Sequence, residues 1–198
     1  MSKIYYLMGK SSSGKDTIYK RLREVFPRLR TVTLYTTRPR REGEKEGDEY
    51  HFVDESILEQ YEKAGKVIEQ RAYDTVCGVW KYFTVDDGQF KPEQEDYLMI
   101  GTLESYENMR AYFGENVLVP IYIEVEDGER LSRALARERQ QIRPKYAEMC
   151  RRFLADTDDF SEEKLMRAGI EERYENTDLD EILRKISQRI QKDSRNLC

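Results

Sequence analysis

Apolar and polar residues alternate in short blocks along this chain, and their spacing predicts strands and helices in turn. Asp54 and Gly65 are placed to cap the two ends of one of these helices. Alternating strands and helices predict an α/β fold with a parallel sheet covered on both faces. Short apolar, β-branched or aromatic runs predict strands at 4–8, 31–35, 51–53, 66–69, 80–85, 97–101 and 117–123. Apolar residues at helical spacing predict helices over 17–25, 54–64, 103–112, 128–141 and from 178 to about 190.

A glycine-rich segment joins the first predicted strand to the first predicted helix. This order is the context in which the pattern G-x-x-x-x-G-K binds phosphate. Glycines let backbone N–H groups turn toward an anion, and the helix N-terminus adds partial positive charge. Lys15 then reaches the outer phosphates as a point charge. We therefore predict a binding site for the phosphates of ATP, formed by Gly9, Lys10, Ser11, Ser12, Ser13, Gly14, Lys15, Asp16 and Thr17.

Asp16 follows the lysine at the position where a serine or threonine normally ligates magnesium, and Thr17 comes one residue later. A carboxylate is a hard oxygen ligand that suits Mg²⁺, and the Thr17 hydroxyl serves if the turn shifts by one residue. We predict Mg²⁺ as the cofactor, with Asp16 and Thr17 as alternative ligands. A carboxylate that only caps the helix is the other interpretation of Asp16.

The amino-acid composition narrows the class of protein further. With 198 residues, 38% hydrophobic and 37% charged, the chain suits one soluble α/β domain with small insertions. No apolar run approaches the length of a membrane span, and the chain begins directly with a strand rather than an export leader. Cys77, Cys150 and Cys198 are scattered, which favours a reducing cytoplasm. A net charge of −5 argues against a nucleic-acid partner, and we expect a monomer or homodimer.

A second motif occupies residues 36–50, with the pattern T-T-R-P-R-R-x-G-E-x-x-G-x-x-Y. Arg38 and Arg41 can form forked, charge-assisted bonds to a monophosphate. Glu44 supplies a carboxylate acceptor and Tyr50 a phenolic donor. Together with residues 9–17, this stretch resembles the GMP-binding signature of guanylate kinases. The resemblance runs from about residue 3 to residue 190 and implies ATP and GMP as substrates.

The resemblance also implies residues that bind the guanine base. Glu69 lies where the family reads the guanine N1–H and amino group, and a buried acceptor facing two donors penalises adenine. If the alignment with the family allows about three extra residues in this chain, Tyr82 takes a phosphate-binding position and Thr84 a base-binding one. Tyr82 also fits a core aromatic. Thr36 completes this implied GMP site.

Two departures from the family pattern concern the same region. Leu34 and Tyr35 stand where the family has a serine. Residues 99–102 read Met-Ile-Gly-Thr where the family reads Leu-Asp-Ile-Asp. Thr102 then takes the base-facing position, with Glu104 or Asp96 as alternatives, and Asp16 restores a negative charge beside the metal.

Arginines form a second cluster towards the C-terminal part. Arg133 and Arg137 are four residues apart on one helix face and resemble the lid arginines of the family, as Arg151 or Arg152 resembles its third. Asn176 lies in a segment that resembles the family's adenine site. Phosphoryl transfer depends on positioning and charge neutralisation. The implied catalytic residues are therefore Lys15, Arg38, Arg133, Arg137 and Arg152.

The resemblance divides the chain into a core (1–34, 91–137 and 166–198), a small β-rich GMP-binding insertion (35–90) and a helical lid (138–165). The favoured reaction is ATP + GMP to ADP + GDP, with dGMP or another nucleotide as a variant acceptor. A kinase resembling ribose 1,5-bisphosphate phosphokinase, which shares the Gly-Lys-Asp loop, is an alternative. A non-catalytic guanylate-kinase-like interaction module is another.

Overall fold

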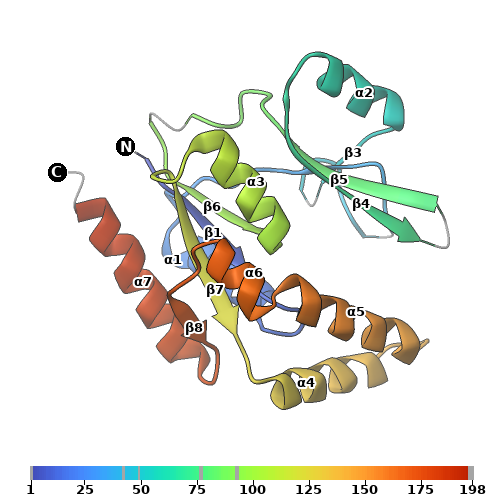
Figure 1. Cartoon of the computed structure of the whole chain (residues 1–198), viewed down its shortest axis with the longest axis vertical. Coiled ribbons are helices and arrows are strands. Elements are labelled where there is room, and N and C mark those ends of the chain that lie inside the picture. Colours follow the sequence, from blue (N-terminus) through green and yellow to red (C-terminus); the bar gives the residue numbers. More distant parts are fainter. Residues whose placement is uncertain (1, 42, 49, 76–77, 92–93, 196–198) are drawn as a thin grey trace.

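Two β-sheets organise the chain in the computed structural model, which describes residues 2–41, 43–48, 50–75, 78–91 and 94–195 (Figure 1). The first sheet is wholly parallel and has the order β6-β1-β7-β8. The predicted α/β class with a parallel sheet is therefore confirmed. Its strands are β1 (Ile4–Met8), β6 (Tyr97–Gly101), β7 (Leu118–Glu124) and β8 (Arg173–Glu175).

Helices bury both faces of this sheet. On one face, Tyr5 and Leu7 of β1 are fully buried in a cluster with residues of α1 (Lys15–Val25) and α7 (Leu179–Arg195). On the other, Tyr6 and Met8 join a cluster with α3 (Leu103–Phe113) and α6 (Glu162–Arg167). Successive side chains of a strand point to opposite faces, so a strand covered on both sides reads as a continuous apolar run.

Pro120 lies inside β7 without breaking the sheet. The carbonyl of Val117 accepts a hydrogen bond from the N–H of Ile4, so the backbone N–H and C=O groups of the odd-numbered residues of β7 point towards β1. Pro120 faces the other edge, where pairing with β8 starts only at Tyr122. The missing N–H of the proline therefore removes no bond of the sheet.

The second sheet is smaller and has the order β3-β2-β5-β4. It consists of β2 (Tyr35–Thr36), β3 (His51–Phe52), β4 (Val67–Thr75) and β5 (Gly78–Val85), and α2 (Glu55–Lys63) packs against it. The Asp54 carboxylate accepts from the N–H of Ile57, which confirms the predicted N-cap of α2. The C-cap is Ala64 rather than Gly65, which follows it with a φ of 66°.

Three predictions about strands are wrong in detail. Residues 31–34 form no strand, because the N–H and carbonyl of Thr33 bond to the Gln89 side chain instead of a neighbouring strand. The hairpin of β4 and β5 extends well beyond the predicted 66–69 and 80–85. β8 was not predicted, since three residues with a charge at each end carry no strand pattern.

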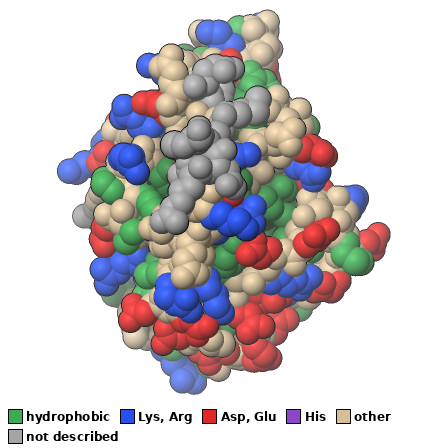
Figure 2. All heavy atoms as spheres, turned by 90° about the vertical axis from the view of Figure 1, so that its left-hand side faces the viewer, with side chains coloured by type: hydrophobic (Ala, Val, Ile, Leu, Met, Phe, Trp, Pro, Cys, Tyr) green, Lys and Arg blue, Asp and Glu red, His purple; other side chains and the backbone are tan. Residues whose placement is uncertain are grey.

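Two further helices complete the chain. α4 (Asp127–Arg139) and α5 (Tyr146–Asp159) pack against each other, at the lower right of Figure 1. The stretch predicted as a helical lid contains α5 and the start of α6. Of the helices in the described ranges, none is long and apolar enough to cross a membrane. Cys150 is free and exposed, whereas Cys77 and Cys198 lie outside the described residues. Acidic and basic side chains are interspersed on the face shown in Figure 2.

Candidate active site

The glycine-rich loop leaves the carboxyl end of β1 and enters α1 at Lys15. Two glycines allow this path for different reasons. A Cβ on Gly9 would lie 2.5 Å from the carbonyl oxygen of Ile123, so the backbones approach too closely for any side chain. Gly14 has a φ of 85°, and its Cβ would lie 2.4 Å from Nδ2 of Asn176. The path of the loop past Ile123 and Asn176 therefore requires glycine at both positions.

Asn176, predicted from the resemblance to lie near adenine, supports this loop from β8. Its side-chain Nδ2 donates to the Ser13 carbonyl oxygen at 2.8 Å, and the residue is 9% exposed. Nη2 of Arg133 donates to the Asn176 carbonyl oxygen at 3.2 Å. The structure therefore brings Asn176 and Arg133 to the loop that contains Lys15.

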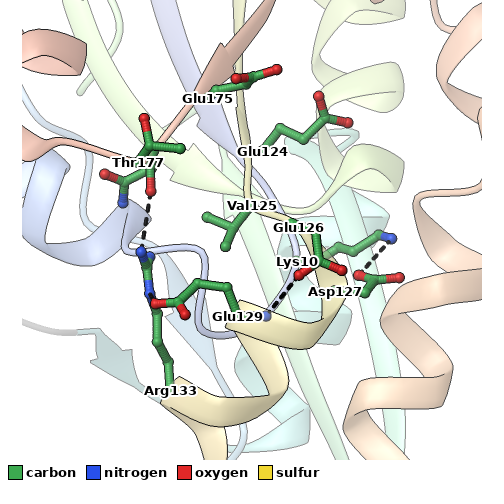
Figure 3. A pocket seen from close by; sticks show the side chains of 10 residues that line it. Lys10, Glu124, Val125, Glu126, Asp127, Glu129, Arg133, Glu175 and Thr177 are labelled. Carbon is green, nitrogen blue, oxygen red and sulfur yellow. Dashed lines mark hydrogen bonds and ion pairs between the residues drawn. The ribbon is translucent and has the colours of Figure 1, made fainter.

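A cavity of about 560 Å³ opens beside the loop (Figure 3). Arg133 and Lys10 are its cations, and Lys10 lies 3.4 Å from Asp127. Acidic side chains make up much of the remaining lining. The complete lining is Lys10, Glu124, Val125, Glu126, Asp127, Glu129, Arg133, Glu175, Asn176 and Thr177.

Two residues of this region were not predicted as site residues. Asp156 of α5 accepts a hydrogen bond from the N–H of Ser11, with an N···O distance of 2.8 Å. Arg130 is 1% exposed, places Nη1 3.3 Å from the same carboxylate and stacks on Phe153 at 3.9 Å. Sequence spacing shows Arg130 one helical turn from Asp127, but it does not show that the arginine is buried.

The other predicted lid arginines are largely exposed. Arg137 is exposed. Arg152 has a 59% exposed side chain and pairs with Glu148, which also binds Arg151. Hydrogen bonds from the two arginines lower the pKa of Glu148 to about 2. In this conformation α5 thus presents Asp156 rather than Arg152 to the loop.

The second motif forms an arginine-centred cluster next to β2. Arg38 is 3% exposed, and its Nη1 and Nη2 bond to the two oxygens of Glu44 at 3.0 and 2.8 Å. Its guanidinium also lies over the ring of Tyr50 at 5.6 Å. Glu44 accepts from the N–H of Arg41 as well, which holds the loop closed. Glu44 therefore positions Arg38 in the structure.

Thr36 and Thr102 use their hydroxyls inside the fold. Thr36 is fully buried, donates to the Lys81 carbonyl oxygen at 2.8 Å and accepts from the N–H of Arg38 at 3.1 Å. Thr102 caps α3 by accepting from the N–H of Ser105. Thr36 thus positions Arg38, which was predicted to bind the acceptor phosphate, whereas Thr102 serves the N-cap of α3.

A buried ion pair lies on one face of the β4–β5 hairpin. Nε and Nη2 of Arg71 donate to the two oxygens of Glu69 at 3.0 and 3.2 Å, and the Thr84 hydroxyl donates to Glu69 at 2.7 Å. Glu69 is 4% exposed and Arg71 8%. Burial is the largest influence on Arg71 and acts to lower its pKa, but the charge and hydrogen bond of Glu69 together with Tyr6 and Tyr73 outweigh it, and the pKa is raised. Glu69 and Thr84, both predicted to contact the base, thus lie side by side, together with Arg71, which the sequence pattern did not single out.

Tyr6 lies between the parallel sheet and this ion pair. It lies on β1, three residues before Gly9, and its hydroxyl is 2.5 Å from Oγ of Ser105. Burial raises the pKa of Tyr6 to about 12, and the charges of Arg71 and Glu69 also act on it. Tyr6 of the parallel sheet therefore lies close to the Glu69–Arg71 pair of the second sheet.

The loop, the parallel sheet and the polar hairpin face define a P-loop α/β protein with a second polar site. The family model for guanylate kinase matches residues 1–78. Among curated relatives, the guanylate kinase of Frankia casuarinae is 42% identical over 67 residues, which cover 34% of this chain and 36% of the relative. That of Oleidesulfovibrio alaskensis is 48% identical over 55 residues, or 28% of this chain and 27% of the relative. The match thus spans about a third of the length of these relatives.

The fold extends the similarity beyond the matched sequence. A solved guanylate kinase from Anaplasma phagocytophilum covers 97% of this chain and 86% of its own, with a TM-score of 0.68 and 19% identity. The chain is therefore similar to guanylate kinases in sequence over its first 78 residues and in fold over nearly its whole length. The resemblance identified from residues 9–17 and 36–50 is confirmed.

Proposed function

We propose that this protein transfers the γ-phosphoryl group of ATP to GMP or dGMP and releases ADP and the nucleoside diphosphate. The observation that carries the proposal is that a glycine-rich loop runs from β1 into α1 at Lys15, and that a second cluster is built around the buried Arg38. Such a pair of sites suits a donor with several phosphates and an acceptor with one. A cytoplasmic location, as the scattered cysteines favour, belongs to the same proposal.

At the donor end, the loop N–H groups and Lys15 bind the phosphates of ATP. The Lys15 side chain is 20% exposed and is thus partly shielded from water, which strengthens its attraction for phosphate oxygens. Arg133 adds a second cation from α4, next to the cavity that would hold the nucleoside of ATP. The remaining lid arginines, Arg137 and Arg152, require a movement of α4 or α5 to reach the phosphates.

At the acceptor end, Arg38 and Tyr50 hold the monophosphate, with Arg41 and Tyr82 as further donors. Glu44 keeps the Arg38 fork oriented, so little side-chain freedom is lost when phosphate binds. Glu69 and Thr84 face the base. The acceptor phosphate is thereby aligned for attack on the γ-phosphorus, and phosphoryl transfer needs mainly this positioning and charge neutralisation.

The loop residues fit a magnesium ion that enters with ATP. Asp16 has an 80% exposed carboxylate 3.9 Å from Nζ of Lys15, and Thr17 follows it with an exposed hydroxyl. Within the described part of the chain, no group of three or more His, Cys, Asp or Glu could hold a metal. One or two protein oxygens are what Mg²⁺ needs when phosphates and waters fill its other positions. When bound, Mg²⁺ neutralises charge that develops on the β- and γ-phosphates.

A coupled assay of ADP release across GMP, dGMP, AMP and ribose 1,5-bisphosphate tests the proposed function. We expect turnover with GMP or dGMP, and kcat/KM at least about a hundredfold lower with AMP, because a buried acceptor would be left unpaired. Turnover with the sugar bisphosphate alone would replace the proposal by the phosphokinase alternative. Binding of nucleotides without ADP release would favour a non-catalytic module.

A further inference from the structure

The face of the β4–β5 hairpin that contains Glu69 is a surface of polar and aromatic side chains from both strands. Glu69, Arg71 and Tyr73 alternate along β4 and so share a face, opposite Thr84, Tyr82 and Trp80 of β5. The rings of Tyr73 and Tyr82 lie 5.7 Å apart, and those of Tyr82 and Tyr50 lie 5.5 Å apart. The surface therefore leads from the Arg38–Tyr50 cluster directly to the Glu69–Arg71 pair.

The ion pair at the end of this surface is not explained by stability alone. Removing two charges from water is unfavourable, and apolar side chains of similar volume often stabilise a fold at least as well. The guanidinium has five N–H groups, and two of them bond to Glu69. That leaves three for other partners, of which the Tyr73 hydroxyl is one. The pair thus offers a ligand both a fixed acceptor and fixed donors.

We propose that Arg71 selects the base of the acceptor by donating to O6 of a 6-oxopurine, beside Glu69. This inference rests on the proposed function. The edge of guanine carries an acceptor, O6, next to two donors, N1–H and the 2-amino group. Glu69 accepts from the donors while Arg71 donates to O6, a contact that arginine makes with guanine elsewhere.

Adenine presents the opposite pattern to the same two side chains. Its 6-amino group would face the donors of Arg71, and its unprotonated N1 would face the carboxylate of Glu69. Both buried groups would then lose a partner, which is how a polar site rejects a base of the same shape. Inosine monophosphate keeps O6 and N1–H but lacks the 2-amino group. It therefore separates the contributions of Arg71 and Glu69.

The test measures dissociation constants of GMP, IMP and AMP by calorimetry, without ATP, for the wild type, Arg71→Met and Glu69→Gln. We expect Arg71→Met to weaken GMP and IMP equally, by about ten- to a hundredfold, because both bases carry O6. The ratio of GMP to IMP affinity should stay unchanged, and the preference over AMP should shrink. Glu69→Gln should instead change the GMP to IMP ratio, since only GMP offers the 2-amino group.

Two further variants keep the test decisive. Arg71→Lys preserves the charge beside Glu69 but removes the planar fork, so its loss should also be equal for GMP and IMP. This variant applies if Arg71→Met fails to fold with Glu69 unpaired, as thermal unfolding would show. Lys81→Met removes a cation of β5 on the opposite face of the hairpin, where Lys81 pairs with Glu55 at 2.6 Å, and should leave all three affinities unchanged.

The outcomes separate the inference from the function on which it rests. If Arg71 only holds Glu69 in place, Arg71→Met should shift the ratio of GMP to IMP affinity as Glu69→Gln does. This result would overturn the inference. Unchanged affinities in Arg71→Met, or a wild type that binds none of the three nucleotides, would overturn it as well. Selective binding of GMP and IMP without phosphoryl transfer would refute the proposed function and leave the role of Arg71 standing.

Discussion

The carboxylate of Asp156 accepts a hydrogen bond from the backbone N–H of Ser11, although the two residues lie 145 positions apart in the chain. The same carboxylate lies 3.3 Å from the buried guanidinium of Arg130. A negative side chain of α5 therefore occupies an N–H of the loop that we propose binds the phosphates of ATP. The contact joins α5 to the phosphate loop in this conformation.

Removing this negative charge should strengthen ATP binding. In Asp156→Asn the side chain keeps its size, but it no longer repels phosphates, and the charge of Arg130 is less compensated. We expect the dissociation constant of ATP, measured by calorimetry at low salt, to fall about two- to fivefold, as for one partly screened charge. Asp158→Asn is the matched control, because Asp158 is 81% exposed and pairs with Lys164. Weaker ATP binding in Asp156→Asn would show that the carboxylate supports the loop in the bound state.

Lys15→Ala should nearly abolish phosphoryl transfer while the fold stays intact. Lys15 directly follows Gly14 and is the first residue of α1, so its charge lies at the point where the loop enters the helix. Loss of one such preorganised charge typically lowers kcat by about 10²–10³. The measurement is ADP release with GMP as acceptor, together with circular dichroism to verify folding. Lys20→Ala, on the exposed side of the same helix, should retain full activity. A folded Lys15→Ala enzyme with normal kcat would rule out the loop as the phosphate site.

Much of the fold follows from the apolar pattern, because a strand buried on both faces and an amphipathic helix leave clear periodicities. The pattern around β1, α1, β6 and β7 predicted the parallel sheet and the loop position. It failed where packing is local or one-sided. Residues 70–74 of β4 include polar Gln70, Arg71 and Asp74, and residues 72–74 are exposed, so their alternation carries no apolar signal for a strand.

The site was harder to predict, since burial decides which of several similar residues matters. Arg130, Arg133 and Arg137 lie on one helix with equivalent chemistry, yet Arg130 is 1% exposed and Arg137 is exposed. Spacing along α4 does not reveal that α5 supplies Asp156 to the first of them. For Arg71 a signal was available, because a charge two residues after Glu69 shares its face of a strand.

Stability should depend on pH through Glu148, whose pKa is lowered to about 2 by hydrogen bonds from Arg151 and Arg152. Because the pKa of Glu148 is lower in the folded state than its unfolded value near 4.5, the ionised side chain stabilises the fold at pH values above 4.5. This contribution is lost as pH falls towards 2. All three side chains are at least a third exposed, so solvent screening limits the effect to about 0.5–1 kcal/mol.

Urea unfolding of Glu148→Gln and the wild type between pH 6 and pH 2 checks this expectation. The variant should be less stable at pH 6, and the difference should shrink as pH falls below about 4.5. Glu163→Gln, on the exposed surface of α6, should show no such trend. A constant difference at every pH would assign the effect to packing instead of charge.

Asp16 should govern the magnesium requirement of the reaction. It stands in the loop where a neutral hydroxyl is usual, whereas β6 has Ile100 where the family resemblance expects an acidic residue. If the proposed function holds, the loop rather than the strand supplies the negative charge near the metal. We expect Asp16→Ala to weaken ATP binding mainly in the presence of Mg²⁺, and to raise the magnesium concentration for half-maximal rate about tenfold, with little effect on GMP binding.

Asp16→Ser should recover activity only in part, and adding Ile100→Asp should recover more. If Asp16 only caps α1, worth ~0.3–1 kcal/mol of stability, Asp16→Ala would lower the melting temperature and leave the magnesium titration of rate and of ATP affinity unchanged.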